Sequence, residues 1–129
     1  MLGFIALLAC SILSPIVIGG TSLAAATTAT SKCSTALPQA QLTQCVAAQV
    51  TSENRILSGD VKKEEAYYKR ALVVASEKAW STYRAQECKL EASIYKGGTV
   101  YPLINENCEL ALTRSRVAQI ETVISNGSH

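Results

Sequence analysis

The sequence has few of the residues that enzymes use for acid–base and nucleophilic chemistry. Its single histidine, His129, is the last residue, and a chain end is a poor place to hold a general base. Histidine-based triads and Cys/His zinc sites are therefore disfavoured. The chain also lacks a glycine-rich loop of the kind that cradles a phosphate. We expect a protein that is not an enzyme and that uses no cofactor and no metal ion.

A strong charge of one sign is also missing. The chain has 12 basic and 10 acidic residues, and its net charge is +2. This balance argues against nucleic acid or a lipid surface as the partner.

Long apolar runs are confined to the N-terminus. Residues 4–18 are apolar apart from Ser11, Ser14 and Pro15, and Ala24-x-Ala26 fits the small-x-small rule for signal cleavage. We expect residues 1–26 to be an export signal and residues 27–129 to be one mature helical domain. No Lys or Arg precedes the apolar run, so either the start is placed wrongly or the signal is atypical.

The segment Leu7-Leu8-Ala9-Cys10 has two interpretations. It matches a lipobox, at which a bacterial lipoprotein is cleaved and acylated, or Cys10 is a coincidental cysteine in an apolar signal. We favour the second interpretation and a periplasmic or secreted protein, with membrane attachment only if Cys10 is lipidated.

Four cysteines remain after cleavage, and an even number in a small exported domain indicates two disulfides. Three pairings are possible, and we favour the two local ones. Metal binding by the four thiols is disfavoured because their spacings are long. The expected pairs are Cys33–Cys45 and Cys88–Cys108.

Three helices are indicated by apolar spacing and by turn residues. The first is expected from Pro38 to about Leu57, with Gly59 as its stop. The second is expected from Val61 to Lys96, with Asp60 as its N-cap and Gly97-Gly98 as its end. The third begins near Pro102 and ends at Asn126-Gly127. The predicted fold is all-α: an antiparallel helical hairpin with a shorter packed N-terminal helix, stapled by two disulfides.

The apolar positions predict which faces are buried. On the third helix, residues recur every seven positions: Leu103, Leu110, Val117 and Ile124. On the second helix, the expected core arc has Val73 and Trp80 at its margin and consists of Tyr68, Leu72, Ala79, Tyr83, Leu90 and Ile94.

Some polar and aromatic groups permit more than one interpretation. Glutamates of the second helix, of which Glu87 and Glu91 are one turn apart, could in principle cleave glycosides, and Glu77 and Glu87 are the residues to test; a solvated helix face is the simpler explanation. Trp80, Tyr83 and Arg84 form an aromatic and basic group with two interpretations. It is either exposed and binds a protein partner, or Trp80 and Tyr83 lie in the core and Arg84 is a surface ion-pair partner.

An ordered series of residues resembles the LprI-like lysozyme inhibitor family, a group of small exported bacterial proteins. The resemblance covers about residues 32–121. Two positions depart from the family pattern: Ala85 stands where an acidic residue is usual, and Thr99 replaces a serine after the glycine pair. The motif residues are Trp80, Tyr83, Arg84, Cys88, Gly97, Gly98 and Cys108, followed by Arg114 and Arg116.

The resemblance implies a protein that binds and inhibits lysozyme and so protects peptidoglycan. Lysozyme has an acidic cleft, so basic and hydroxylic side chains are the candidates for contacting it. Two alternatives remain open: a non-enzymatic envelope adaptor without lysozyme activity, and a wall-active hydrolase. The candidate partner-binding residues are Arg84, Lys96, Thr99, Tyr101, Arg114 and Arg116.

Overall fold

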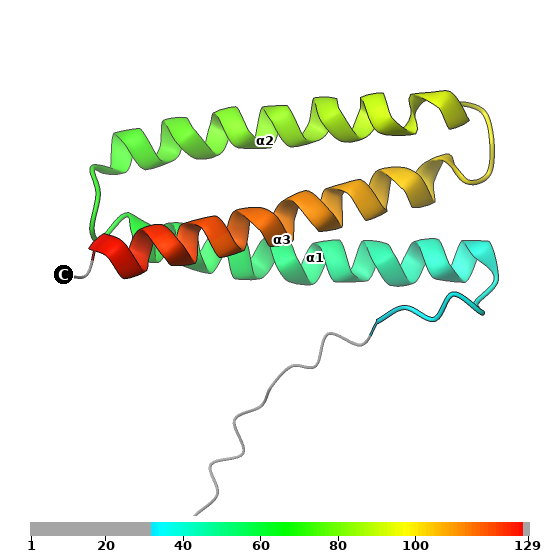
Figure 1. Ribbon diagram of the computed structural model, residues 1–129, viewed down its shortest axis with the longest axis horizontal. Coiled ribbons are helices and arrows are strands. Elements are labelled where there is room, and N and C mark those ends of the chain that lie inside the picture. Colours follow the sequence, from blue (N-terminus) through cyan, green and yellow to red (C-terminus); the bar gives the residue numbers. More distant parts are fainter. Residues whose placement is uncertain (1–31, 128–129) are drawn as a thin grey trace, which may run out of the picture.

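The computed structural model describes residues 32–127, and Figure 1 shows them as three long helices. Helix α1 spans Gln39–Glu64, α2 spans Arg70–Ala92, and α3 spans Tyr101–Gly127, with a short 3₁₀ turn, Ser93–Tyr95, after α2. The expected signal, Cys10 and His129 lie outside the described residues. No helix in residues 32–127 is long and apolar enough to cross a membrane.

The all-α fold with an antiparallel hairpin is confirmed. Helices α2 and α3 form the hairpin, and α1 packs mainly on α3 (Figure 1). Helices α1 and α3 run parallel, so both begin at the end of the bundle where the α2–α3 loop lies. The N-terminal helix is not the short element that we expected, because α1 has 26 residues and α2 has 23.

The predicted boundary between the first two helices was wrong. Helix α1 continues through Gly59 and ends at Glu64, so Asp60 is not an N-cap. Asp60 is instead buried, and its Oδ1 lies 2.7 Å from Lys63 Nζ. A glycine inside a helix costs only about 1 kcal/mol, which the packing of Leu57 and Val61 on α3 outweighs.

The chain reverses later than expected, between Glu64 and Arg70, so the predicted helix from Val61 to Lys96 is interrupted. No glycine or proline marks this turn. Tyr68, a residue of this turn, fixes the position of the turn through a contact with α3: its hydroxyl donates to the carbonyl of Val123 at 3.3 Å. Gly127 makes room for the ring: a Cβ there would lie 2.9 Å from the Tyr68 hydroxyl oxygen.

Two small apolar clusters form the core. The first joins Val46 and Val50 of α1 to Leu110 of α3, with Leu42 and Leu103 packed against it. The second consists of Leu57, Val117 and Ile120, with Val61, Trp80 and Ile124 packed against it. The seven-residue pattern expected for the third helix is therefore confirmed as its inward face.

The buried face predicted for the second helix was wrong. Helix α2 buries Val73, Cys88 and Ala92. Leu72, Leu90 and Ile94 are 66%, 67% and 81% exposed. Val73 and Trp80, at the margin of the expected arc, thus face the core. The disulfide at Cys88 and the polar contacts of α2 with α3 fix the rotation of α2 about its axis.

Both expected disulfides are present. Cys33–Cys45 ties the lead-in segment to α1, and Cys88–Cys108 joins α2 to α3. Their Cα–Cα distances of 5.9 and 5.4 Å lie within the usual range for disulfides. The second bridge closes a loop of 20 residues around the turn between the helices.

Candidate functional site

A polar layer separates the two apolar clusters, and Arg84 lies at its centre. Its Nη1 donates to Asn54 Oδ1 at 2.8 Å and to Thr113 Oγ1 at 2.7 Å. Thr113 is completely buried and donates in turn to the carbonyl of Glu109. One guanidinium thus links all three helices. Both of these Nη1 partners are neutral.

Trp80 and Arg84 also form the wall of a groove between α1 and α2. The guanidinium carbon of Arg84 lies 4.9 Å from the centre of the Trp80 ring. Asn54, Leu57 and Ser58 of α1 form the opposite wall of a volume of about 240 Å³. Trp80 is half-buried and packs against the second apolar cluster, which agrees with its interpretation as a core residue.

Arg114 connects α3 to α1. Its Nε donates to Glu53 Oε1 at 2.9 Å, and one of its Nη atoms lies 3.4 Å from Gln49 Oε1. Glu53 is buried, so this ion pair supplies the partner that a buried carboxylate requires.

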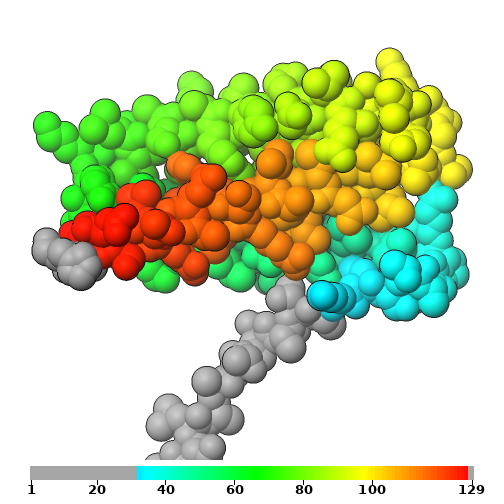
Figure 2. Space-filling view, in the orientation of Figure 1, coloured from blue at the N-terminus to red at the C-terminus, as the bar shows by residue number. Residues whose placement is uncertain are grey.

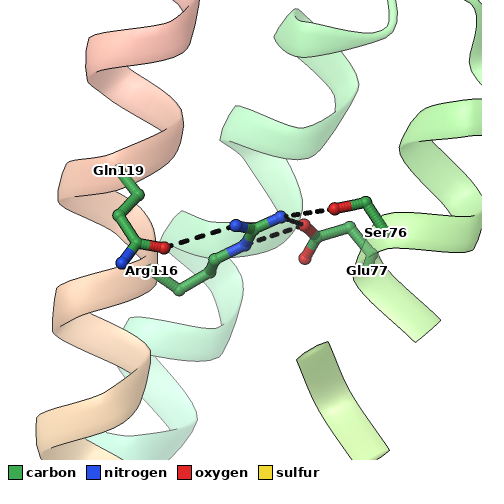
Figure 3. Close-up of polar contacts among 4 residues, drawn as sticks. All are labelled: Ser76, Glu77, Arg116 and Gln119. Atoms are coloured by element: carbon green, nitrogen blue, oxygen red, sulfur yellow. Dashed lines mark hydrogen bonds and ion pairs between the residues drawn. The ribbon is translucent and has the colours of Figure 1, made fainter. Parts of the chain in front are cut away.

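Arg116 connects α3 to α2, as Figure 3 shows. Its guanidinium forms an ion pair with Glu77 and donates to Ser76 Oγ at 3.0 Å and to Gln119 Oε1 at 3.3 Å. The side chains of Arg116 and Glu77 are only 16% and 17% exposed, so water screens the pair weakly.

A second carboxyl group lies near this ion pair. Burial raises the pKa of Glu64, and the nearby charge of Glu77 raises it further, while Arg116 acts in the opposite direction. The Oε2 atom of Glu64 is buried and has no hydrogen-bond partner.

The loop between α2 and α3 places Lys96 and Thr99 in solvent. Gly97 has φ of +83°, a conformation that side chains other than glycine rarely adopt. The amide of Gly98 donates to the carbonyl of Tyr95 at 2.9 Å, and a Cβ on Gly98 would lie 3.1 Å from that oxygen. The glycine pair thus allows a tight turn, after which Tyr101 begins α3 half-buried.

The loop and the start of α1 together border a hollow of about 490 Å³. Its polar lining consists of Thr99 from the loop and Gln39, Thr43 and Gln44 from α1. The first turns of α1 and α3 contain no acidic residue, and both N-termini lie at this end (Figure 1). The positive ends of the α1 and α3 dipoles and the Lys96 ammonium therefore lie together at this end, beside the negative end of the α2 dipole; we call it the loop end.

The six candidate residues fall into two groups. Lys96, Thr99 and Tyr101 lie together at the loop end, whereas Arg84, Arg114 and Arg116 lie along the bundle and bond to neighbouring helices. Three polar residues that line the hollow could not be identified from the sequence, because they lie beside the loop only when α1 and α3 pack parallel. They are Gln39, Thr43 and Gln44. Within residues 32–127, no group of three His, Cys, Asp or Glu side chains is arranged to hold a metal ion.

These features define a small, disulfide-stapled three-helix domain with a polar arginine layer and an exposed glycine-turn loop. The family model described as "Lysozyme inhibitor LprI" matches residues 29–120, and the chain belongs to this family. Comparison with the curated proteins and with the solved structures found no significant match.

Proposed function

We propose that this protein binds lysozyme and inhibits it, with the loop end as the contacting surface. The observation that carries the proposal is the family match over residues 29–120. The loop end adds a physical reason. It presents an exposed lysine, a hydroxyl and the N-termini of α1 and α3, neither with an acidic residue in its first turn, which complement an acidic cleft that contains catalytic carboxylates.

The three arginines act in this proposal by positioning the helices. Each guanidinium already donates to side chains of neighbouring helices, so moving one into a partner would break those bonds. Arg84 and Arg116 fix α2, which leads into the loop. The disulfide Cys88–Cys108 lies between this layer and the loop and holds the two helices that carry it.

Two disulfides and membership of an inhibitor family also support export to an oxidising compartment. We propose that residues 1–26 direct this export and that the mature domain acts in the periplasm or outside the cell. In this setting an inhibitor meets lysozyme before the enzyme reaches peptidoglycan.

A lysis assay tests the proposal. The oxidised protein is titrated into c-type lysozyme acting on a suspension of bacterial cell walls, and turbidity is followed with time. We expect dose-dependent slowing of lysis that saturates near a molar equivalent of inhibitor. Unchanged lysis at a large molar excess would overturn the proposal for this lysozyme class.

The envelope-adaptor alternative predicts a different pattern. An adaptor leaves the rate of lysis unchanged but retains a specific exported protein on an affinity column. The wall-hydrolase alternative predicts release of muropeptides without added lysozyme. Glu77 is a poor candidate for such catalysis because Arg116 already holds its carboxylate.

A further inference from the structure

Helix α2 carries an apolar stripe on the side that no other helix covers. Figure 2 shows α2 as one long edge of the molecule, in green to yellow-green. Leu72, Tyr83 and Leu90 are 66%, 52% and 67% exposed, and they lie within about 20° of one another around the helix axis. The stripe is completed by Ser76, Ala79 and Gln86, which are also exposed.

The spacing of the stripe is that of a coiled-coil seam. Its six residues alternate by four and three positions, which keeps them on one side of a helix that packs against a similar helix. Leu72, Tyr83 and Leu90 place three large exposed side chains in one line along α2, and a second helix packed along this line would cover all three.

The stripe is complementary to itself when a second copy is turned end to end. In an antiparallel pair centred at the level of Ser81, residues equally far from this position meet each other. Leu72 meets Leu90, and the large Tyr83 meets the small Ala79. The remaining two residues, Ser76 and Gln86, are both polar, and the Ser76 hydroxyl, which accepts from Arg116 at 3.0 Å, still has a proton to donate to Gln86. A large side chain opposite a small one, and a polar one opposite a polar one, is what a packed seam requires.

The charges beside the stripe favour the same orientation. In the antiparallel pair Lys89 lies level with Val73, and Glu87 lies level with Ala75, so neither of these charges meets a like charge. In a parallel pair Lys89 would meet its own copy, and Ala79 would leave a gap opposite Ala79. The antiparallel arrangement is therefore the one that both shape and charge support.

We propose that this stripe joins two copies of the chain in a two-fold symmetric dimer, with the two α2 helices antiparallel. The stripe from Leu72 to Leu90 is about 27 Å long, and two copies in contact bury on the order of 1,000 Å². This area lies at the lower limit for a specific interface, so we expect a weak dimer that dissociates on dilution. The loop ends point away from each other and stay free.

Sedimentation velocity of the oxidised protein tests the dimer. We expect a concentration-dependent shift from monomer to dimer, and Leu72→Lys and Leu90→Glu should each abolish it. Ile56→Glu is the matched control, because Ile56 is a large apolar residue that is 44% exposed on α1. Circular dichroism checks that every variant stays helical, which is expected because the altered side chains are exposed.

Mixing the two monomeric variants tests the orientation. Leu72→Lys and Leu90→Glu form an ion pair across one end of an antiparallel seam and leave the leucines paired at the other end, so the mixture should dimerise. A parallel seam would not be restored. A wild-type protein that stays monomeric at several hundred micromolar would overturn the proposal.

The stripe proposal does not depend on the proposed inhibition of lysozyme. The Leu72→Lys variant should inhibit lysis as well as the wild type does per chain, because the loop end is unchanged. Binding of the monomeric wild type to anionic phospholipid vesicles, lost in Leu90→Glu, would assign the stripe to a lipid surface and would also overturn the dimer.

Discussion

At the scale of single residues, Arg84 bonds to both of the other helices at once. It bonds to α1 through Asn54 and to α3 through Thr113, and its guanidinium lies over the Trp80 ring. Its sequence context, between Tyr83 and Ala85 on a helix, gave no indication of these contacts. They arise because α2 is rotated so that the margin of its apolar arc, rather than the arc itself, faces α3.

We expect Arg84→Ala to lower the free energy of unfolding by about 2 to 3 kcal/mol, because two charge-assisted hydrogen bonds and the ring contact are lost. Chemical denaturation of oxidised protein measures this change. Arg55→Ala, at an exposed position on α1, should change it by less than about 0.5 kcal/mol. Equal effects of the two variants would show that the arginine layer is not structural.

Glu64 gives a prediction about pH. Because its pKa is raised in the folded protein, its ionised form lowers stability at neutral pH, and the loss disappears as pH falls below about 4, where folded and unfolded chains are both protonated. Glu64→Gln should therefore raise the melting temperature at neutral pH and leave it unchanged in acid. Glu91→Gln, which removes an exposed carboxylate of α2, is the control. A lower melting temperature for Glu64→Gln at neutral pH would contradict this account.

At the scale of elements, the sequence was sufficient for some helix ends and not for others. The end of the second helix and the start of the third were predictable, because Gly97-Gly98 permits the turn that the chain makes there. The turn between α1 and α2 was not, because neither glycine nor proline occurs in it. Its position depends on Tyr68 reaching the far end of α3, a contact between residues 55 positions apart.

Gly59 gives the test of the corrected boundary. It lies inside α1, does not have a positive φ, and has nothing within 4 Å of the position of an added Cβ. Gly59→Ala should therefore stabilise the protein by about 0.5 to 1 kcal/mol, because alanine has the higher helix propensity. Thermal unfolding measures the gain. A loss of stability would indicate that Gly59 ends the helix after all.

At the scale of the whole molecule, the family and the all-α class could be recognised from the sequence, whereas the surfaces could not. The cysteine pairing followed from local spacing and is confirmed. The exposed stripe on α2 was mistaken for core, because an apolar arc has the same pattern whether it faces a helix of the same chain or the outside. The hollow at the loop end depends on parallel packing of α1 and α3, which no local motif encodes.

The most direct test of the central claim is the affinity of c-type lysozyme for three forms of the protein, measured by calorimetry. The account predicts that the wild type binds and that Lys96→Glu weakens binding at least tenfold, or about 1.4 kcal/mol. Lys78→Glu makes the same charge change at an exposed position in the middle of α2 and should bind like the wild type. Equal weakening by both variants would contradict contact through the loop end, and absence of binding by the wild type would contradict the proposed function itself.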